Sequence, residues 1–404
     1  MLKHDIKIAY VIGAPFPTMK AYGVTSRETI NVLLNNKIRT RVFCLNGQYH
    51  DSDYKNILKE ITEFTKNIAS QLLITLGSMG SSKINFFCWR LGLAKIISKN
   101  LGLIKDYDPE LIWVRDPMIA YLYLKNFKSV NVILEVHDKS GIFFHKKLIK
   151  YNARVSYFPI NQTNSDFLLN LISKANSNIA SMGIRDENLA SKNDCIKFTN
   201  SLKRRCNKSI SIGYIGKIAP GGYSKGTEDL IQLAKYAQSN ELKLNVTLVG
   251  ATEIDLPKLN IVRKELAIRK NFLSFKTHIK HTEALSLMKS FDILILPAYS
   301  SERYVGMPLK LLEYLSTGKI TIMADIPLYK NIFKQNFRPF FYTPGDIDSL
   351  TKSIYSALES NNLNDHLIKG VNFASEFTWT NRTLMMLAKT KFKANIHDKF
   401  KTKM

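Results

Sequence analysis

Cysteine is scarce in this sequence, and the metal-binding motifs built on cysteine are missing. The 404 residues include four cysteines, Cys44, Cys88, Cys195 and Cys206. No two of them form a Cys-x-x-Cys pair, and no cysteine and histidine stand at the spacing of zinc ligands. A few isolated cysteines of this kind are typical of reduced thiols in the cytoplasm. We therefore expect a cytoplasmic protein without a cysteine-based metal site.

Long apolar runs are also missing. No stretch of about 18 uninterrupted apolar residues occurs, so no segment is predicted to span a membrane. The first residues, MLKHDIKIAYVIG, mix charged and apolar residues over a short distance, unlike the long apolar core of a signal peptide. We interpret them as the first strand of a domain.

Acidic residues are few compared with basic ones. The chain has 33 Asp and Glu against 58 Lys and Arg, so its formal net charge is +25. A field of this sign attracts nucleic acid, anionic lipid or phosphorylated substrates. A composition rich in Lys, Asn and Ile, as an AT-rich genome produces, explains the charge equally well. No basic motif studded with aromatic residues is present, which argues against nucleic acid as the partner.

What the sequence does contain is an alternation of short apolar runs and helical patterns. Such runs between helices indicate parallel strands covered on both faces, the doubly wound α/β pattern. The runs of the first half are 6–12, 42–45, 111–114 and 130–136. Residues 190–209 are polar and basic with little periodicity, and we interpret them as containing a linker. The alternation then restarts at 210–215 and continues at 244–249, 293–296 and 320–323.

This rhythm predicts two Rossmann-like domains. We expect a first domain over residues 1–198 and a second domain over residues 199–375. A helix and tail over residues 376–404 should cross back onto the first domain.

Three loops are candidates for binding an anion or a sugar. The loop GAPFPTMKAYG, residues 13–23, leaves a strand and enters a helix, where backbone N–H groups are free to bind, although an ordinary strand–helix turn looks the same. The second loop follows the strand at 210–215, and its Gly216, Lys217 and Lys225 could neutralise a diphosphate. In a lysine-rich chain these two lysines could equally be solvated surface residues.

The third candidate is YVGMPLKLLEYLSTGK, residues 304–319. Pro308 suits the first turn of a helix, and Glu313 lies one turn further on. A carboxylate there could accept two hydrogen bonds from neighbouring hydroxyls such as a ribose diol. The alternative is a glutamate that only favours the helix dipole.

The order and wording of these stretches resemble the GT-B glycosyltransferases, specifically those of glycosyltransferase family 4. The resemblance is strongest in GYIGKI with KGTEDLI, in LNVTLVG, in HTEALSLMKSFDILILP and in PLKLLEYLSTGKITIMADIP. The closing ASEFTWTNRTLMML resembles the crossover helix of that family. In the first half, LIWVRDP, VILEVHDKSG and IASMGIRDE fit at the expected places, so the resemblance covers nearly the whole chain.

The resemblance implies that residues 1–198 form the acceptor-side domain and residues 199–375 the nucleotide-sugar-binding domain. It also implies roles for single residues. His137 would be the catalytic-site histidine that contacts the donor sugar, and Gly23 would border that sugar. Glu313 would bind the donor ribose, and the amides of Leu309 and Lys310 would receive phosphate oxygens. The full implied donor site consists of Gly23, Gly216, Lys217, Lys225, Tyr304, Pro308, Leu309, Lys310 and Glu313. A histidine that merely satisfies a strand end is the alternative for His137.

One departure from the family pattern concerns the recognition of the sugar. Many relatives have an earlier glutamate, with seven residues between it and the one that matches Glu313. Here Val305 stands at that place and Glu302 is out of register. Candidates from the same loop are Ser300, Ser301, Glu302 and Tyr304.

The implied reaction moves a sugar from a nucleoside diphosphate donor to an acceptor hydroxyl, with retention of anomeric configuration and without a metal or other cofactor. Surface polysaccharide or glycolipid assembly, with a sugar or lipid-linked acceptor, is the expected setting. A nucleotide-sugar epimerase or a phosphorylase of the same fold remains open. So does a non-enzymatic basic protein on a membrane surface.

A membrane partner would be anionic and would lie at the inner face of the membrane. The apolar, aromatic and basic stretch of residues 84–105 is the candidate contact. The favoured interpretation of that stretch is a domain helix that packs on the sheet.

Overall fold

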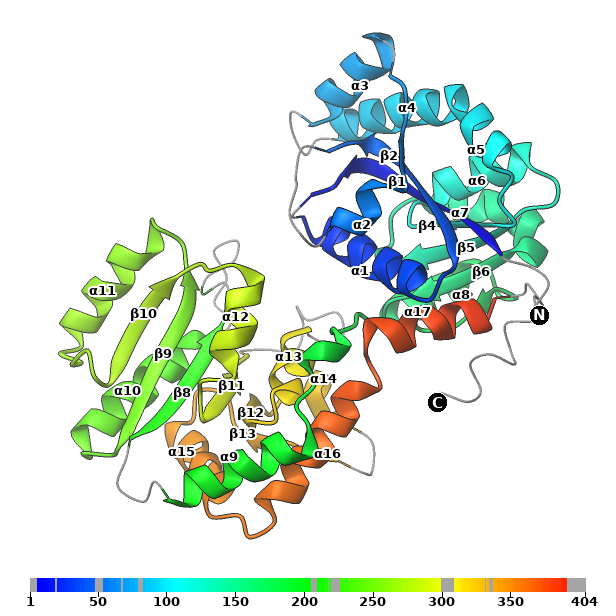
Figure 1. Ribbon diagram of the computed structural model, residues 1–404. Helices are drawn as coiled ribbons and strands as arrows, with labels where there is room; N and C mark the ends of the chain where they lie inside the picture. Colours follow the sequence, from blue (N-terminus) through cyan, green and yellow to red (C-terminus); the bar gives the residue numbers. More distant parts are fainter. Residues whose placement is uncertain are drawn as a thin grey trace. The chain divides into compact units, whose positions relative to one another are not determined.

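The computed structural model describes residues 6–18, 20–47, 54–66, 68–78, 83–204, 209–216, 218, 226–298, 309–330, 332–333 and 337–390. They form two compact α/β units (Figure 1). The first unit takes residues Met1–Met182 together with Trp379–Met404, and the second takes Gly183–Thr378. The two doubly wound domains predicted by the alternating pattern are confirmed.

The first domain is built on a seven-stranded sheet with the order β3-β2-β1-β4-β5-β6-β7, in which every neighbouring pair is parallel. Its strands are β1 (Lys7–Phe16), β2 (Arg39–Asn46), β3 (Ile61–Glu63), β4 (Leu111–Val114), β5 (Asn131–Val136), β6 (Val155–Pro159) and β7 (Asn176–Ser177). Its helices are α1 (Ala21–Asn35), α2 (Lys55–Leu58), α3 (Ile68–Ser78), α4 (Lys83–Lys99), α5 (Leu101–Tyr107), α6 (Pro117–Asn126), α7 (Ile142–Leu148), the 3-10 helix η2 (Ile149–Arg154), α8 (Gln162–Leu171) and α17 (Trp379–Ala388).

Both faces of this sheet are buried, as a near-continuous apolar strand requires. Residues of β4 alternate between two cores: Ile112 and Val114 belong to one, Leu111 and Trp113 to the other. The first core includes residues of α4 and α6, and the second includes residues of α1 and α17.

The second domain has a six-stranded parallel sheet with the order β10-β9-β8-β11-β12-β13. Its strands are β8 (Ile210–Ile215), β9 (Leu244–Ala251), β10 (Leu273–Thr277), β11 (Ile293–Leu296), β12 (Ile320–Ala324) and β13 (Phe340–Tyr342). Its helices are the 3-10 helix η3 (Asp186–Asn188), α9 (Lys192–Arg204), α10 (Thr227–Ser239), α11 (Asp255–Glu265), α12 (His281–Met288), α13 (Leu309–Ser316), α14 (Pro327–Lys330), α15 (Ile347–Leu358) and α16 (Leu363–Ser375).

The boundary between the domains differs from the expected one near residue 198. Residues interpreted as part of a linker form α9, which packs against α16. Cys195, Phe198, Thr199 and Leu202 are its buried residues, at the i, i+3, i+4 and i+7 spacing of a helix face. Because this apolar stripe belongs to the core of the second domain, the domain begins at Gly183 and not after α9.

The chain returns to the first domain at Trp379. There α17 packs against α1 and contributes Leu384, Met386 and Leu387 to a core of the first domain. The residues after Thr390 lie outside the described part of the chain.

The candidate membrane stretch, residues 84–105, forms α4 and α5. Leu93, Ile96 and Ile97 of α4 are buried in the core beneath the sheet, as the favoured interpretation predicts. Among the described residues, no helix combines the length and the apolar character needed to cross a membrane.

Candidate functional site

Each sheet has a topological switch point, the place where ligands of open α/β folds bind. In the second domain β8 has β9 on one side and β11 on the other, so the connections that leave β8 and β11 diverge to opposite sides. In the first domain β1 and β4 stand in the same relation. Those predicted site residues that the structure describes lie near these two points.

Gly216 ends β8, and its backbone requires glycine. Its φ of 153° is a conformation that residues with a side chain rarely adopt. A Cβ atom here would coincide with the ammonium group of Lys310, which comes from the first turn of α13. Lys310 Nζ donates to the hydroxyl of Tyr214 at 3.1 Å and lies 4.6 Å from the centroid of that ring. A cation is therefore held directly over the end of β8.

Two more glycines let the backbone pack closely at this edge. Gly250, at the end of β9, has a φ of 116°, and a Cβ atom there would meet the carbonyl oxygen of Gly216. Gly226 is the N-cap of α10 with a φ of 78°, and a Cβ atom there would stand 2.9 Å from the nitrogen of Ala298, just after β11. The ends of β8, β9 and β11 thus form one edge with few side chains.

Glu313 lies on α13 and is buried, with 6% of its surface exposed. Its Oε1 stands 2.7 Å from Nε2 of His281, the first residue of α12. The carboxylate engaged in this contact lies on the same short helix as Lys310. A buried carboxylate held by one histidine suits a second hydrogen-bonded group such as a hydroxyl.

The structure does not test every predicted donor residue. Gly216, Leu309, Lys310 and Glu313 lie together around β8 and α13. Leu309 and Lys310 open α13, where the positive end of the helix dipole favours an anion. Lys217, Lys225, Tyr304 and Pro308 lie outside the described residues, as do Ser300, Ser301 and Glu302.

His137 of the first domain follows β5 and is held from both sides. Its Nδ1 is 2.8 Å from Nη2 of Arg115, and its Nε2 is 2.9 Å from Oε2 of Glu135. Arg115 follows β4 and also donates to α1, to the carbonyl of Tyr22 at 3.0 Å and to Oγ1 of Thr25 at 2.5 Å. His137 is therefore fixed at the carboxyl edge of the sheet, beside the switch point.

Glu135 is a buried carboxylate with three donors. It accepts from Trp113 Nε1 at 2.6 Å, from Arg382 Nη2 at 2.7 Å and from His137. Burial alone would raise its pKa, but the charge of Arg382 and the hydrogen bond from His137 outweigh burial and hold the pKa well below its usual value. Glu135 is therefore ionised.

These partners determine the protonation state of His137. Burial lowers its pKa, the charge of Arg115 lowers it further, and Glu135 offsets part of the change. A guanidinium can only donate and a carboxylate can only accept, so the neutral ring carries its proton on Nε2 and accepts at Nδ1. Both nitrogens are engaged, and neither is available as a general base in this arrangement.

Gly23 lies in the first turn of α1, and it has a structural reason to be glycine. A Cβ atom at this position would meet the carbonyl oxygen and the side chain of Thr18. The loop before α1 therefore packs directly against Gly23. The strand before that loop also runs further than expected, because β1 pairs with β2 as far as Phe16.

A cavity of about 220 Å³ surrounds the His137 network. Its lining carries both signs of charge and includes a second histidine, His145 of α7. Lining residues are Trp89, Arg90, Arg115, Asp116, Pro117, Glu135, Val136, His137, Asp138, Ser140 and His145. This composition suits a polar molecule with several hydroxyl groups.

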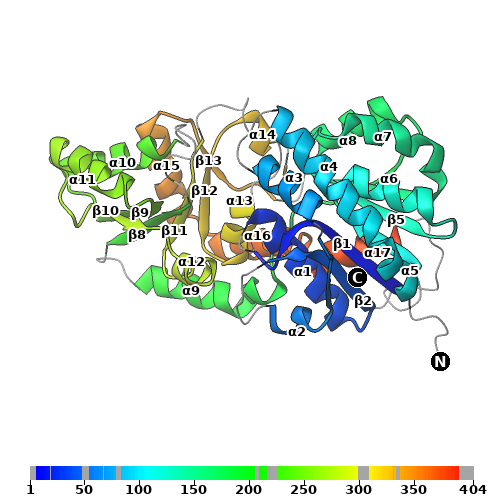
Figure 2. The ribbon, with the colours of Figure 1, turned by 90° about the horizontal axis from the view of Figure 1, so that it is seen from above.

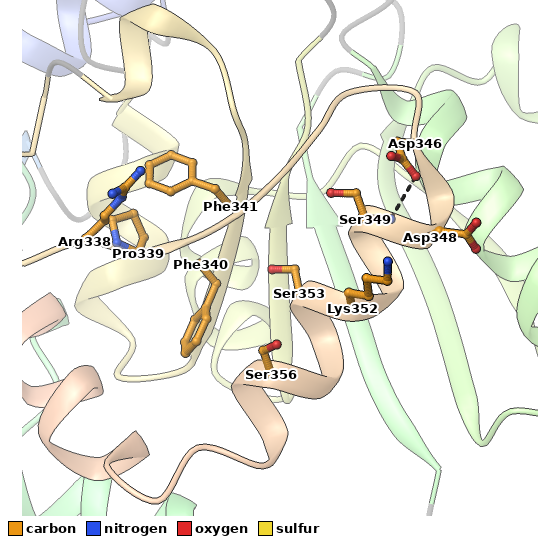
Figure 3. Close-up of a pocket in the computed structure, with 10 residues that line it drawn as sticks. All are labelled: Arg338, Pro339, Phe340, Phe341, Asp346, Asp348, Ser349, Lys352, Ser353 and Ser356. Atoms are coloured by element: carbon orange, nitrogen blue, oxygen red, sulfur yellow. Dashed lines mark hydrogen bonds between the residues drawn. The ribbon is translucent and has the colours of Figure 1, made fainter.

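A larger cavity of about 600 Å³ in the second domain lies between β13 and α15 (Figure 3). It is lined by Arg338, Pro339, Phe340, Phe341, Asp346, Asp348, Ser349, Lys352, Ser353 and Ser356. In the sheet β12 separates β13 from β11, so this cavity is not at the switch point, and none of the predicted donor residues lines it. Within the described ranges, no group of three or more His, Cys, Asp or Glu residues is arranged to hold a metal ion.

Several residues that hold the predicted site residues in place were not predicted from the sequence. Glu135 was detectable, because it stands two residues before His137 near the end of the same strand and so points to the same face. Arg115 belongs to the stretch LIWVRDP, but nothing in that stretch predicts its contact with His137. His281 and Arg382 carried none either, since each meets its carboxylate across a long separation in sequence.

Comparison with known proteins agrees with the fold. Residues 207–371 match the family model described as Glycosyl transferases group 1. No protein of curated function matches the chain in sequence.

Solved structures resemble the chain over nearly its whole length. The Anabaena protein HepE in complex with UDP has 14% identity and a TM-score of 0.61, with 95% of this chain and 99% of that chain covered. The lipopolysaccharide outer core galactosyltransferase WaaB has 15% identity and a TM-score of 0.62, with 96% and 99% covered. A glycosyltransferase from Rickettsia africae has 16% identity and a TM-score of 0.62, with 97% and 99% covered. At these identities the likeness establishes the fold, the GT-B arrangement of two parallel-sheet domains.

Proposed function

We propose that the chain is a glycosyltransferase that moves a hexose from a UDP-hexose to an acceptor hydroxyl with retention of configuration, a proposal supported by the match of residues 207–371 to the group 1 family model. The observation that carries the proposal is the bare strand edge at Gly216, with Lys310 above it and the buried carboxylate of Glu313 on the same helix. The choice of UDP is supported by HepE, which was solved with UDP and with UDP-glucose.

In the proposed donor complex, each part of the nucleotide meets a different group. The ribose hydroxyls donate to Glu313. The diphosphate receives the amides of Leu309 and Lys310 at the start of α13, where the helix dipole favours an anion. Lys217 and Lys225 complete the neutralisation of the diphosphate. Gly216 leaves room for the phosphates beside the backbone.

The proposed chemistry breaks the bond between the anomeric carbon and the diphosphate oxygen and forms one to the acceptor oxygen on the same face of the sugar. The acceptor proton goes to the departing phosphate oxygen, so no side chain is required as a base. Charge that develops on the leaving diphosphate is stabilised by donors already in place. No resident metal or other cofactor is part of the proposal, so EDTA should leave the rate unchanged.

His137 is the proposed first-domain contact to the transferred sugar. Its neutral ring, held between Arg115 and Glu135, fits a transfer that uses no general base. We also propose that the acceptor is a sugar or a lipid-linked sugar of surface polysaccharide or glycolipid assembly, reached at the inner face of the membrane. The setting is supported by the similarity to WaaB, a lipopolysaccharide outer core galactosyltransferase, and by the net charge of +25.

The decisive test changes Glu313 to Gln and measures UDP and GDP binding by calorimetry. Hydrogen bonds to a charged group contribute about 1.5–3 kcal/mol, so Glu313→Gln should weaken UDP binding roughly tenfold to a hundredfold. The matched control is Glu253→Gln, an exposed glutamate just before α11. Equal UDP affinity in the Glu313→Gln variant and the wild type would mean that this glutamate is structural.

The remaining alternatives differ in what they consume. A phosphorylase would need inorganic phosphate and would release a sugar 1-phosphate. An epimerase would change the nucleotide-sugar with no acceptor present. Product analysis with UDP-glucose and UDP-galactose, with and without phosphate and a hexose acceptor, separates both from the proposed transferase.

A further inference from the structure

The first domain presents an exposed apolar and basic surface to which the proposed reaction gives no role. It lies on α7 and η2, directly after the His137 loop. Phe143 is 62% exposed, Ile149 48% and Ile142 47%. The nearby lysines Lys139, Lys146, Lys147 and Lys150 are exposed as well. We define the α7 surface as Lys139, Ile142, Phe143, Lys146, Lys147, Ile149 and Lys150.

Apolar residues of α4 adjoin the α7 surface. Phe87, 61% exposed, and Leu91 lie about one helical turn apart, on the same side of α4 as Arg90. The guanidinium carbon of Arg90 is 5.7 Å from the centroid of Phe144 on α7. Both helices pack against α6, as Figure 2 shows. The exposed apolar area therefore spans two neighbouring helices.

The two faces of α7 have different surroundings. His145 and Leu148 are buried, and His145 lines the cavity that also holds His137. Phe143, Lys146 and Lys147 point the other way, into solvent, with Lys147 Nζ 5.3 Å from the Phe143 ring centroid. One short helix thus joins the first-domain cavity to the exposed surface.

Charge distinguishes the α7 surface from another exposed apolar patch, on α11. Residues 139–154 contain five basic residues and no acidic one, namely Lys139, Lys146, Lys147, Lys150 and Arg154. Ile254 and Ile261 of the α11 region are also exposed, at 74% and 54%. Yet residues 253–265 there contain three acidic and three basic residues, so that patch has no net charge.

We propose that the α7 surface docks on an anionic lipid bilayer. Aromatic and aliphatic side chains enter the boundary between headgroups and acyl chains, while lysines lay their carbon stems along it and keep their ammonium groups among the anionic headgroups. This inference extends the proposed function, since a lipid-linked acceptor at that bilayer would be next to the cavity of His137.

The test is flotation with vesicles of phosphatidylcholine alone or with phosphatidylglycerol added. Wild-type protein should float with the anionic vesicles and should be released at about 0.5 M salt, where charges are screened over a few ångströms. Since each lysine near such a surface contributes roughly a fivefold change, Lys146→Glu/Lys147→Glu should lower the partition at least tenfold. Phe143→Ser, which keeps every charge, should lower it about tenfold.

Matched controls come from α11. Lys258→Glu/Lys264→Glu makes the same change in net charge, and Ile254→Ser removes an equally exposed apolar side chain, so both should bind vesicles like the wild type within about threefold. Equal loss in the α7 and α11 variants would overturn the proposal in favour of a diffuse charge effect. So would equal wild-type binding to both vesicle types. UDP affinity, measured in the same variants, should not change, so failure of the donor proposal is seen separately.

Discussion

At the scale of single residues, glycines mark the places where one segment of chain must approach another. Gly216 and Gly250 have positive φ angles at the ends of adjacent strands, and side chains there would meet Lys310 or the backbone. Gly102 of α5 has nothing within 4 Å of a Cβ position. The same substitution should therefore have opposite effects at Gly216 and Gly102.

We expect Gly216→Ala to lower the free energy of unfolding by about 1–3 kcal/mol through backbone strain. It should also weaken UDP binding, because the added methyl displaces Lys310 from Tyr214. Gly102→Ala should raise stability by up to about 1 kcal/mol through helix propensity. Urea unfolding followed by circular dichroism measures both effects. A Gly216→Ala protein with wild-type stability and UDP affinity would refute the assignment of this edge.

His145 should make the first domain sensitive to acid. Burial, opposed by Asp138 and assisted by Arg90, lowers its pKa to about 4. Between that value and the unfolded pKa of about 6.5 the unfolded chain binds more protons, so stability falls as pH falls. We expect this residue to account for a loss of about 2 kcal/mol between pH 7.5 and pH 5.

The control for that pH effect is His145→Gln, which removes the titrating group and keeps a polar side chain. Urea unfolding at pH 7.5 and pH 5 should show a smaller pH difference in the variant than in the wild type. His137, whose pKa is also lowered by burial, should leave part of the pH dependence in place. An unchanged difference would show that His145 is accessible to protons in the folded state.

The sequence predicts which site residues lie near one another where the motif is local. Gly216, Leu309, Lys310 and Glu313 were assigned together, and they do lie around one strand end. Prediction failed for partners that come from distant segments: 247 residues separate Glu135 from Arg382, and 32 separate His281 from Glu313. No periodicity or spacing encodes such pairs, since they arise only when the sheets are assembled.

At the scale of secondary structure, the least obvious helix in the sequence is α9. Charged residues obscure its apolar stripe, but a capping box marks its start. The backbone N–H of Ser191 donates to Asp194 Oδ2 at 2.8 Å, and the N–H of Asp194 donates to Ser191 Oγ at 3.1 Å. Ser-x-x-Asp ahead of a helix is the sequence signature of this arrangement. It was present, and it outweighs the basic composition that suggested a linker.

We expect Ser191→Ala to lower the stability of the second domain by about 1 kcal/mol, the usual effect of losing an N-cap. Ser191→Thr, which keeps the hydroxyl, should recover most of the loss. Urea unfolding followed by circular dichroism measures the difference. If Ser191→Ala unfolds like the wild type, α9 contributes little to the domain, and the boundary belongs nearer to residue 198.

Sequence patterns predicted the strands unevenly. The long buried runs of β1, β5 and β8 were assigned from their apolar residues alone. By contrast, β3 and β7 have only three and two residues and were not predicted. Edge strands this short bury little, so they leave no run of apolar residues to detect.

At the scale of the whole molecule, the three tryptophans report on one domain only. Trp89, Trp113 and Trp379 all belong to the first unit, although Trp379 follows the whole second domain in sequence. Tryptophan fluorescence should therefore follow unfolding of the first domain, while circular dichroism follows both domains.

We use this distribution to test the buried pair of Arg382 and Glu135. Arg382→Met leaves a buried carboxylate without its main counter-charge, a change that typically lowers stability by about 3–5 kcal/mol. The midpoint of the fluorescence transition should move to a lower urea concentration, as this loss of stability requires. Phe198→Ala, in the core of the second domain, should move the circular dichroism transition and leave the fluorescence transition in place. Identical shifts of both signals in both variants would mean that the domains unfold as one unit.

The return of the chain to the first domain has a consequence for synthesis on the ribosome. The carboxylate of Glu135 is made early, but Arg382 is added only after every strand of the second domain has been translated. Until then the nascent first domain lacks α17, which contributes side chains to its core, and Glu135 is without its counter-charge. The second domain is contiguous in sequence, so all of its residues are available once Thr378 has been translated. The domain that is translated first is therefore the one completed last.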